Sequence, residues 1–415
     1  MRRNVLVGVA VFLLSSSFAY AAEPVEPTTP ATGAPAAGIP PSDAPSVEKV
    51  KVSQWPGIIS IYTPGAGWPA DPVEADAKLK AVVDANFGGY YYNLGAYEPI
   101  KKAGLKLLVG AWLFEFEKMG PEMRNDPTIL GYMMSDRQKP NFFPTWGAWE
   151  KMMYEKDPYH PALFTTYEAY GHVADFVNIV KPRAIEFYHY HWSRRGQLYF
   201  QTLEIYRNES IRAGRIPVIQ YVAVEVDDPR KMRQTTYTSL AYGLRGFKWF
   251  VGWLFFDAKK GEDGKWVVKR TPAGEEVAKL NKAIKAYSPI YAKAPSVDVF
   301  HVQPLPAWGR EAPKDYWAVP SGEEILVGYF QDKELVDYLM ISNRDAFKPH
   351  EATITFSEKI TSVSKMNKET GNWEAVKLTT TGGKQQLKST IEDGSGELFM
   401  VVRSAKKSAF AQPKK

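Results

Sequence analysis

Short apolar runs alternate with longer segments of helical spacing between residues 57 and 294. Apolar runs of about four to eight residues are typical of strands buried on both faces, as in a parallel sheet. The longer segments carry helix signals, such as Pro72 in a first turn and Gly104 or Gly214 after a last turn. We expect strands at 57–62, 88–94, 105–114, 128–140, 162–167, 184–192, 217–222 and 247–256, and helices at 71–85, 97–103, 144–156, 173–180, 198–213, 230–242 and 274–294.

Strands that alternate with helices over roughly 240 residues predict an α/β fold, a (β/α)8 TIM barrel, which we place at residues 49–295. The alternative is a doubly wound sheet, which requires a Gly-rich phosphate turn after the first strand. Residues 63–67 contain two glycines but neither a G-x-G-x-x-G motif nor a P-loop motif. We therefore interpret this segment as an ordinary loop and favour the barrel.

After residue 295 the pattern changes to shorter runs in which apolar and polar residues alternate. Such runs are typical of antiparallel strands with one buried face. Turn signals such as Gly382-Gly383 separate them. The pattern predicts a small antiparallel β-sandwich at residues 296–403, followed by a basic, disordered tail at 404–415. The sandwich strands are expected at 325–330, 337–342, 352–356, 363–366 and 397–402.

The first 21 residues have the pattern of a secretory signal peptide. A positive start at Arg2-Arg3 precedes an apolar stretch, and Ala19-Tyr20-Ala21 forms a small-x-small cleavage site. An anchoring helix is the alternative, which we disfavour because the apolar stretch is too short to span a bilayer comfortably. Residues 22–48 are rich in Pro, Ala and Thr and are expected to form a disordered linker. The mature protein is expected to be secreted or periplasmic, with no membrane span.

Composition narrows the range of functions. The chain has no cysteine, which excludes disulfides, thiolate zinc sites and a cysteine nucleophile. No basic stripe with a nucleic-acid motif occurs, so we expect no nucleic-acid partner. We also expect no cofactor. The oligomeric state stays open. The net charge of +6 favours an acidic partner such as an anionic polysaccharide. Trp, Tyr and Phe reach 13% of the residues. Surplus aromatic residues usually belong to the core, but sugar-binding clefts also use them, because sugar rings pack well on aromatic faces.

The fourth strand ends abruptly in charged residues. Residues 129–134 are apolar, and Ser135, Asp136 and Arg137 follow directly. Barrel enzymes keep their chemistry at the carboxyl ends of the strands, so this switch makes Asp136 and Arg137 candidate site residues. The alternative is that the two side chains only pair with each other at the end of a strand.

Several short motifs occur in a fixed order along the chain. Residues 126–132 with Asp136 match a fourth-strand pattern D-P-x-I-L-G-Y followed by D-E-P, and residues 157–161 match D-P-x-H-P ahead of strand five. Further matches to the helix before strand eight, the last barrel helix and a sandwich strand lie at 230–246, 280–284 and 342–345. Residues 57–403 thus resemble secreted bacterial glycoside hydrolases of the clan-A barrel type, and more narrowly β-galactosidase- and agarase-like barrels with a C-terminal β-sandwich.

This resemblance implies a retaining mechanism with two carboxyl groups about 5–5.5 Å apart. It implies an acid/base Glu after an Asn or Asp at the end of strand four, and a nucleophilic Glu at the end of strand seven. Asp136 matches the Asn or Asp, whereas Arg137 replaces the Glu and cannot act as a general acid. Glu225 lies in the loop after strand seven. Our catalytic hypothesis is therefore Asp136 as proton donor and Glu225 as nucleophile or charge stabiliser.

Other polar and aromatic residues are predicted near strand ends. His189 and His191 share one face of strand six by the two-residue period of a strand. A metal site is disfavoured because the sequence pattern offers no set of ligands that completes a coordination sphere, and a hydrogen bond to a sugar is preferred. The predicted substrate-binding residues are Asn93, Trp112, Glu115, Arg137, Tyr167, His189, His191, Gln220 and Trp253.

Three functions fit the sequence. The first is hydrolysis of glycosidic bonds in a polysaccharide or oligosaccharide. An anionic glycan would match the net positive charge of the chain. The second is a degenerate barrel that binds glycan without hydrolysis. The third is a structural envelope protein that uses the linker and the basic tail. Likeness of fold does not decide among them, because one fold hosts many functions.

Overall fold

A computed structural model describes residues 55–65, 67–110, 113–136, 139–166, 171–190, 192 and 196–404. The predicted signal peptide and linker, and the predicted tail beyond Ser404, lie outside these residues. Four predicted site residues also lie outside them: Trp112, Arg137, Tyr167 and His191. Within the described part of the chain, no helix has both the length and the apolar character needed to cross a membrane.

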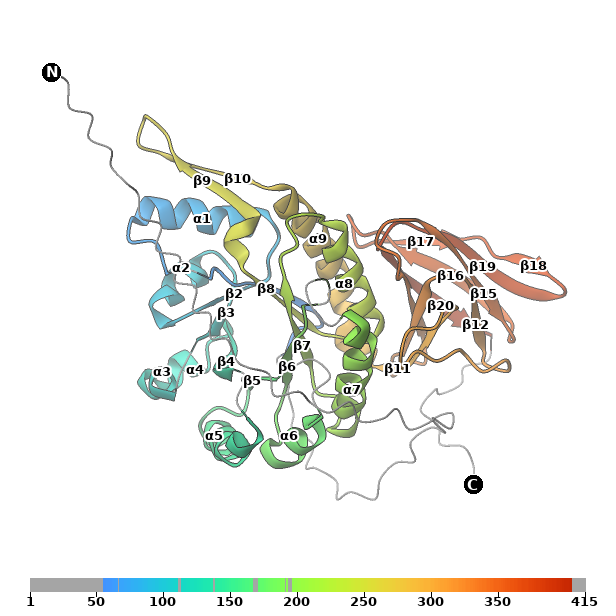
Figure 1. Cartoon of the computed structure of the whole chain (residues 1–415), viewed down its shortest axis with the longest axis horizontal. Coiled ribbons are helices and arrows are strands. Elements are labelled where there is room, and N and C mark those ends of the chain that lie inside the picture. The colour runs from blue at the N-terminus through green and yellow to red at the C-terminus, as the bar shows by residue number, and fades with distance from the viewer. Residues whose placement is uncertain are drawn as a thin grey trace. The chain divides into compact units, whose positions relative to one another are not determined.

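Eight parallel strands of the described chain close into a barrel and follow one another around it in chain order (Figure 1). The last strand pairs with the first from Ile59 beside Gly246 to Tyr62 beside Trp249, which closes the ring. This arrangement confirms the predicted (β/α)8 barrel. The strands are β1 (Ile59–Tyr62), β2 (Gly89–Tyr92), β3 (Lys106–Val109), β4 (Ile129–Asp136), β5 (Ala162–Thr166), β6 (Ile185–Tyr188), β7 (Val218–Ala223) and β8 (Gly246–Phe250).

Helices connect the strands and cover the outside of the barrel (Figure 1). Asp71 and Thr271 cap the first and last of them, because their side chains accept hydrogen bonds from backbone N–H groups of the first turn. The helices are α1 (Pro72–Asp84), α2 (Tyr97–Lys102), α3 (Leu113–Lys118), α4 (Pro121–Arg124), α5 (Phe143–Lys156), α6 (Val173–Val180), α7 (Tyr199–Arg212), α8 (Arg230–Ala241) and α9 (Pro272–Lys293). Single 3-10 turns lie at η1 (Leu94–Ala96), η2 (Pro140–Phe142), η3 (Gly196–Leu198) and η4 (Gly252–Phe255).

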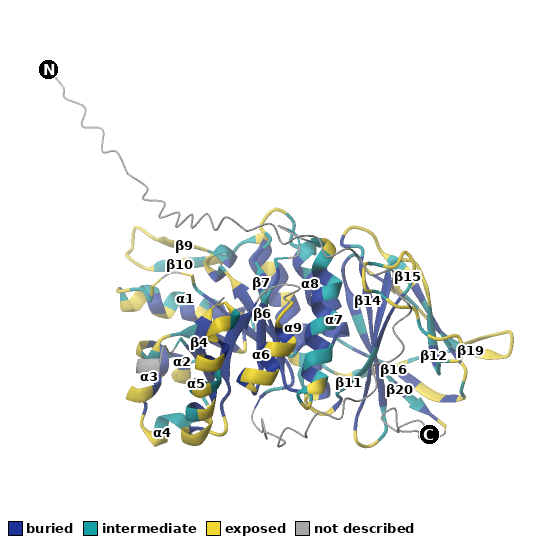
Figure 2. Ribbon diagram, turned by 60° about the horizontal axis from the view of Figure 1, so that its bottom comes forward, coloured by how far each residue is buried: buried dark blue, intermediate teal, exposed yellow. Residues whose placement is uncertain are grey.

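Alternation of side chains along each strand divides the core of the barrel into two layers. The barrel strands are buried along most of their length (Figure 2). The inner layer includes the apolar residues Ile59, Ile61, Leu108, Leu130, Leu163 and Ile219. The outer layer lies between the strands and the helices, where Phe164 stacks on Trp146 of α5 with ring centroids 5.1 Å apart. Because both layers are buried, the residues at the strand ends are held on a rigid frame.

The third strand is shorter than predicted. It ends at Val109, and α3 begins at Leu113. Glu115 therefore lies on a helix and not in a loop, and its side chain pairs with Lys118 one turn further on, at 3.1 Å. The apolar run at 105–114 contains both the strand and the start of this helix, and an apolar run alone does not separate the two.

The eighth strand is also shorter than predicted, because it ends at Phe250. The apolar run after it forms η4 and then an antiparallel hairpin of β9 (Phe256–Lys260) and β10 (Trp266–Arg270), which we did not expect. Asp257 therefore lies on an exposed hairpin strand and not at the end of a barrel strand. The turn depends on Gly252, since a Cβ atom there would lie 2.5 Å from the ring of Tyr62.

Two antiparallel sheets follow the barrel and form the predicted β-sandwich. One sheet has the order β11-β13-β14-β20-β16-β17, and the other has the order β12-β15-β19-β18. Their strands are β11 (Ser296–His301), β12 (Ala318–Gly322), β13 (Ile325–Gln331), β14 (Asp337–Asn343), β15 (His350–Phe356), β16 (Ile360–Met366), β17 (Trp373–Val376), β18 (Thr379–Thr381), β19 (Lys384–Ile391) and β20 (Gly396–Arg403). Of these, β11, β12, β17, β18 and β19 were not expected.

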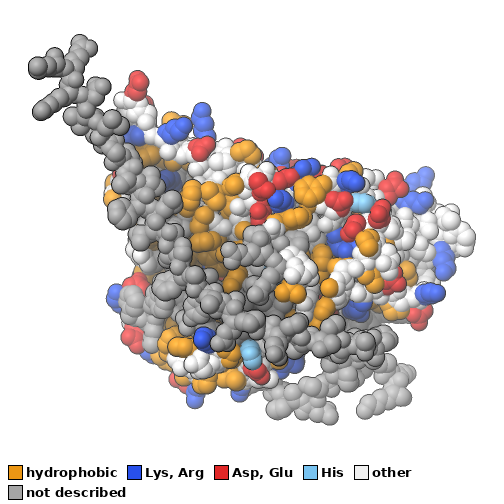
Figure 3. Space-filling model, in the orientation of Figure 1, with side chains coloured by type: hydrophobic (Ala, Val, Ile, Leu, Met, Phe, Trp, Pro, Cys, Tyr) orange, Lys and Arg blue, Asp and Glu red, His pale blue; other side chains and the backbone are white. Residues whose placement is uncertain are grey.

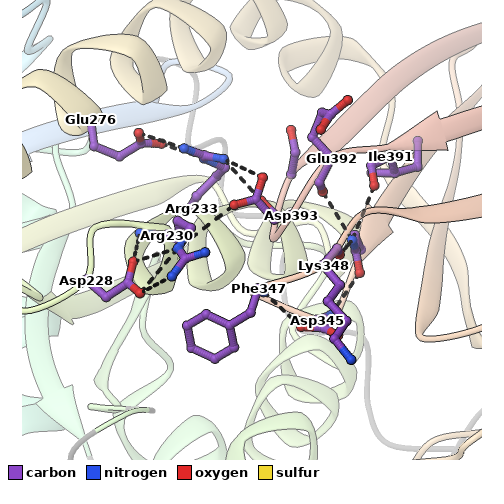
Figure 4. A network of polar contacts seen from close by, with 12 residues as sticks. Asp228, Arg230, Arg233, Glu276, Asp345, Phe347, Lys348, Ile391, Glu392 and Asp393 are labelled. Carbon is purple, nitrogen blue, oxygen red and sulfur yellow. Dashed lines mark hydrogen bonds and ion pairs between the residues drawn. The ribbon is translucent and has the colours of Figure 1, made fainter.

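Helix α8 lies between the barrel and the sandwich. It packs on β13, where a Cβ atom on Gly328 would lie only 2.0 Å from the carbonyl oxygen of Ala241. Arg233 of α8 donates to Glu276 of α9 at 2.7 and 2.9 Å and to the Asp393 carboxylate at 3.2 Å (Figure 4). Nine of the twelve α8 residues are buried. The barrel and the sandwich therefore share one well-packed contact along this helix.

Candidate active site

A lysine and a glutamate meet inside the barrel. Lys248 comes from β8 and Glu186 from β6, and both side chains point inward. Lys248 Nζ lies 2.9 Å from Glu186 Oε1 and 3.2 Å from Oε2, and neither side chain is exposed. Thr165 of β5 donates a further hydrogen bond to Glu186. A buried ion pair persists only where each charge is compensated in this way, so the pair is a fixed feature of the barrel interior.

Two tyrosine rings enclose the ammonium group of Lys248. Its Nζ lies 4.6 Å from the ring centroid of Tyr91 on β2 and 4.3 Å from that of Tyr221 on β7. Burial raises the pKa of Tyr91 to about 12, and the negative charge of Glu186 adds to this effect. Burial likewise raises the pKa of Tyr221, again with a contribution from Glu186. Both phenols are therefore protonated at neutral pH and able to donate hydrogen bonds.

Asp136 lies at the carboxyl edge of the same cluster. It is the last residue of β4, and its side chain is exposed. Its charge contributes to the raised pKa of both Tyr91 and Tyr221, after burial and Glu186, so the carboxylate and the two phenols share one region of the barrel end. This is the end of the strands at which the sequence pattern placed Asp136.

Glu225 lies in the loop between β7 and α8 and is partly buried. Burial raises the pKa of its carboxyl group and the charge of Asp227 raises it further, whereas Lys231 acts in the opposite direction. Asp227 and Lys231 form an ion pair with each other. Glu225 is thus shifted toward its protonated form, which suits a proton donor better than the nucleophile role that we assigned from the sequence.

His189 and Gln220, both predicted to bind substrate, lie on the side of the strands that faces the helices. His189 Nδ1 is 3.1 Å from the hydroxyl of Thr202 on α7. Gln220 accepts a hydrogen bond of 2.6 Å from Ser239 of α8 and is fully buried. The two-residue period explains the position of Gln220, because its neighbour Tyr221 points into the barrel. Neither residue belongs to the cluster of Asp136 and the two tyrosines.

The other described candidates lie near the carboxyl end of the barrel. Asn93 follows β2 and caps η1, where its side chain accepts a hydrogen bond of 3.0 Å from Gly95 N. Trp253 lies in η4 just after β8 and is 53% exposed. Hydrophobic side chains gather on the described surface over the barrel (Figure 3). The exposed ring of Trp253, beside the strand ends, is suited to pack against a sugar ring.

Sequence reasoning missed four residues of the cluster: Tyr91, Glu186, Tyr221 and Lys248. Two of them had a readable signal. Glu186 and Lys248 are single charges inside the otherwise apolar strands IEFY and GFKWF. A lone charge at an inward position of a buried strand requires a partner of opposite sign, and the alternating pattern of β6 and β8 would have paired the two.

The cluster offers a carboxylate and two phenols, and the loop after β7 adds a carboxyl group with a raised pKa. Groups of these kinds allow hydrogen bonding to hydroxyls and acid–base chemistry. Three or more His, Cys, Asp or Glu side chains placed to hold a metal ion are not found together anywhere in the described part of the chain.

The chain matches no protein family model and no curated protein. Its fold is similar to that of a β-galactosidase from Bacillus circulans sp. alkalophilus, with a TM-score of 0.53 at 9% identity over 85% of this chain and 100% of that chain. A GH27 β-L-arabinopyranosidase from Geobacillus stearothermophilus aligns with a TM-score of 0.46 at 10% identity over 87% of this chain and 100% of that chain. At such identities the β-galactosidase likeness shows a shared fold alone.

Proposed function

We propose that the carboxyl end of the barrel binds a carbohydrate and hydrolyses a glycosidic bond. One observation carries the proposal: Asp136 ends β4 and shares its surroundings with Tyr91 and Tyr221, the two rings that enclose Lys248. An exposed carboxylate beside protonated phenols can act on an acetal while the phenols hold sugar hydroxyls. The fold shared with a β-galactosidase supports a glycoside as the substrate.

Glycoside hydrolysis requires a second carboxyl group, and Glu225 is our candidate. Its pKa is raised by burial and by Asp227, so it keeps a proton to higher pH than an ordinary glutamate and can give that proton to the leaving oxygen. Asp136 then acts as the nucleophile or as the base that activates water. The distance between the two carboxyl groups distinguishes these roles, since retention requires about 5–5.5 Å and inversion about 6.5–9.5 Å. We therefore propose the two roles in the reverse order from our sequence-based hypothesis.

The substrate class follows from charge and aromatic content. The chain carries a net charge of +6 and 13% aromatic residues, which suits a poly- or oligosaccharide with carboxylate or sulfate groups. The N-terminal sequence pattern adds the proposal that the protein is exported, with cleavage near Ala21, and meets this glycan in the periplasm or outside the cell.

The test is a panel of neutral and anionic polysaccharides, with reducing ends measured after incubation and retention measured on affinity gels. Release of reducing ends by the wild type, lost in Asp136→Asn and in Glu225→Gln, supports hydrolysis. Asp257→Asn is the matched control, because Asp257 is an exposed carboxylate on the β9 hairpin strand, outside the proposed site. Full activity of both carboxylate variants on a substrate that the wild type cleaves contradicts the assignment.

A second candidate function is glycan binding without hydrolysis. It is favoured by the state of Glu186, the carboxylate inside the barrel, which is fully buried and neutralised by Lys248. Retention of a glycan on the affinity gel without release of reducing ends supports this function. If the glycans are neither retained nor cleaved, the result supports the third function, a structural protein of the cell envelope.

A further inference from the structure

Two aromatic side chains, one from the barrel and one from the sandwich, meet beside the loop that carries Glu225. Trp192 lies in the segment after β6, and Phe347 lies in the turn between β14 and β15. Their ring centroids are 5.8 Å apart at an interplanar angle of 70°, which is an edge-to-face contact. We call this pair the aromatic platform. It takes one ring from each of the two domains.

The turn that carries Phe347 is fixed by hydrogen bonds (Figure 4). Phe347 N donates to Asp345 Oδ1 at 2.8 Å. The buried side chain of Asn343 donates to the carbonyl oxygens of Lys348 and Glu392, at 2.6 and 3.1 Å. Phe347 itself is 45% exposed. An apolar ring that is both exposed and held in place can pack against another molecule with little further loss of conformational entropy.

The start of α8 holds the platform from the side of the barrel. The indole N–H of Trp192 donates to Lys231 O at 3.2 Å, and Lys231 Nζ lies 5.7 Å from the centroid of the indole ring. The guanidinium group of Arg230 lies 5.0 Å from the ring centroid of Phe347 (Figure 4). Both rings are therefore positioned by cations of the same helix end.

These two cations already have acidic partners. Arg230 donates to both carboxylate oxygens of Asp228, at 3.0 and 2.7 Å. Lys231 forms an ion pair with Asp227. The four charges balance, so the platform is suited to a ring rather than to an anion. A sugar ring fits such a surface, because its CH groups can pack on an aromatic face while its hydroxyls bond to the carboxylates nearby.

The platform lies close to the carboxyl group that we propose as the proton donor. Burial raises the pKa of Glu225, and Lys231 opposes this shift. The hydrogen bond with Asp227 raises the pKa of Lys231, and the charge of Glu225 adds to this effect. Glu225 and Lys231 therefore lie within electrostatic reach of each other, and Lys231 in turn contacts the ring of Trp192. A glycan whose reacting bond lies at Glu225 reaches the platform by extending past Lys231.

We propose that the aromatic platform is a second sugar subsite, supplied in part by the sandwich, which packs against a ring of the glycan away from the reacting bond. The proposal rests on the proposed function, carbohydrate binding at the carboxyl end of the barrel. It adds a substrate class, namely a chain of several sugar units rather than a disaccharide. It also gives the sandwich a part in substrate binding, through Phe347.

The test compares the two-unit and six-unit oligosaccharides of galactan, agarose, polygalacturonate and carrageenan, of which two are neutral and two are anionic. Calorimetry measures their dissociation constants with the full chain in an Asp136→Asn background, so that no glycan is cleaved during the titration. We expect the six-unit glycan to bind more tightly than the two-unit glycan. Phe347→Ala should weaken binding of the six-unit glycan by about tenfold and remove most of this preference. The factor should be similar for neutral and anionic glycans.

Two further variants separate packing on a sugar from a structural role of the ring. Phe347→Tyr keeps an aromatic face and should retain the preference for six units. Phe347→Leu keeps apolar volume without a ring and should lose most of it. Tyr159→Ala is the matched control, because Tyr159 is 44% exposed but precedes β5, at the amino end of the barrel. Thermal unfolding shows whether each variant is folded.

The inference is overturned if the two lengths bind equally tightly before Phe347 is changed, or if Phe347→Ala and Phe347→Leu keep the preference for six units. If none of the glycans binds at either length, the proposed carbohydrate binding is wrong as well. A protein that binds the glycans without cleaving them tests the platform equally well, because binding is what is measured.

Discussion

Lys248 Nζ lies 2.9 Å from Glu186 Oε1, and neither side chain has any exposed surface. This ion pair lies inside the barrel, where the rings of Tyr91 and Tyr221 enclose the ammonium group of Lys248. A pair of this kind stabilises the fold little as a whole, because desolvation offsets the attraction, but the loss of one partner is costly. The cluster therefore depends on both charges being present.

We expect Lys248→Met to lower the free energy of unfolding by about 3–5 kcal/mol, since Glu186 is left as an unpaired buried charge. Urea unfolding followed by tryptophan fluorescence measures the change. The double variant Lys248→Met with Glu186→Gln is the control and should recover most of the loss, because an amide carbonyl still accepts the hydrogen bond from Thr165. Equal losses in the single and double variants contradict this account.

The second prediction concerns the pH dependence of activity on a substrate that the wild type cleaves. Glu225 must carry a proton to act as donor, so kcat/KM should fall as the pH rises through its raised pKa. Glu225→Gln should lower kcat by roughly 10²–10⁴-fold. Asp227→Asn removes a negative charge that raises this pKa, so the fall of kcat/KM with rising pH should occur at lower pH in this variant. A fall that stays in place in Asp227→Asn argues against Glu225 as the donor.

The third prediction concerns stability in acid. Burial lowers the pKa of His301 well below its usual value, and Arg344 and Arg310 add to the effect. Below about pH 6.5 the unfolded chain takes up a proton at this residue that the folded chain does not. The free energy of unfolding therefore decreases as the pH is lowered, by up to about 1.4 kcal/mol per pH unit. His301→Gln should flatten this slope, because glutamine does not titrate and can still bond Tyr242. Urea unfolding at pH 5 and 8 measures it, and an unchanged slope contradicts the assignment.

The fourth prediction concerns the contact between the barrel and the sandwich. A Cβ atom on Gly328 would lie 2.0 Å from the backbone oxygen of Ala241, so Gly328→Ala should force α8 and β13 apart. We expect a loss of about 1–3 kcal/mol or more, as for other overpacked positions. Gly171→Ala is the matched control, since nothing lies within 4 Å of a Cβ atom there. Thermal unfolding compares the two, and equal melting temperatures contradict the predicted clash.

The sequence predicted the barrel because its strands and helices have different hydrophobic periods, and the two periods alternate along the chain. It predicted the sandwich from its most apolar strands. It missed strands such as β18 (Thr379–Thr381), whose three residues are all exposed and carry no apolar signal. It also merged η4 with β8, because aromatic residues favour a strand unless a close contact, here that of Gly252 with Tyr62, imposes a turn.

Prediction of the site depended on where each strand ends. Asp136 was placed at the correct edge, because the change from apolar to charged residues marks the end of β4. The inward or outward direction of Gln220 was not predictable without the register of β7, since a shift of one residue reverses every side chain. The raised pKa of Glu225 depends on burial and on Asp227, which are properties of the folded loop.

Helix α8 buries hydroxyl side chains as well as apolar ones. Thr236 and Thr238 donate to the carbonyl oxygens of Met232 and Gln234, at 2.8 and 2.7 Å, which satisfies polar groups that have no access to water. The sandwich covers the side of this helix that another barrel would expose to solvent. A barrel expressed without the residues beyond Pro295 would therefore expose the apolar surface of α8 and associate with itself. Residues of the barrel and of the sandwich belong to one hydrophobic cluster, so removal of the sandwich would also remove part of the core that the barrel uses.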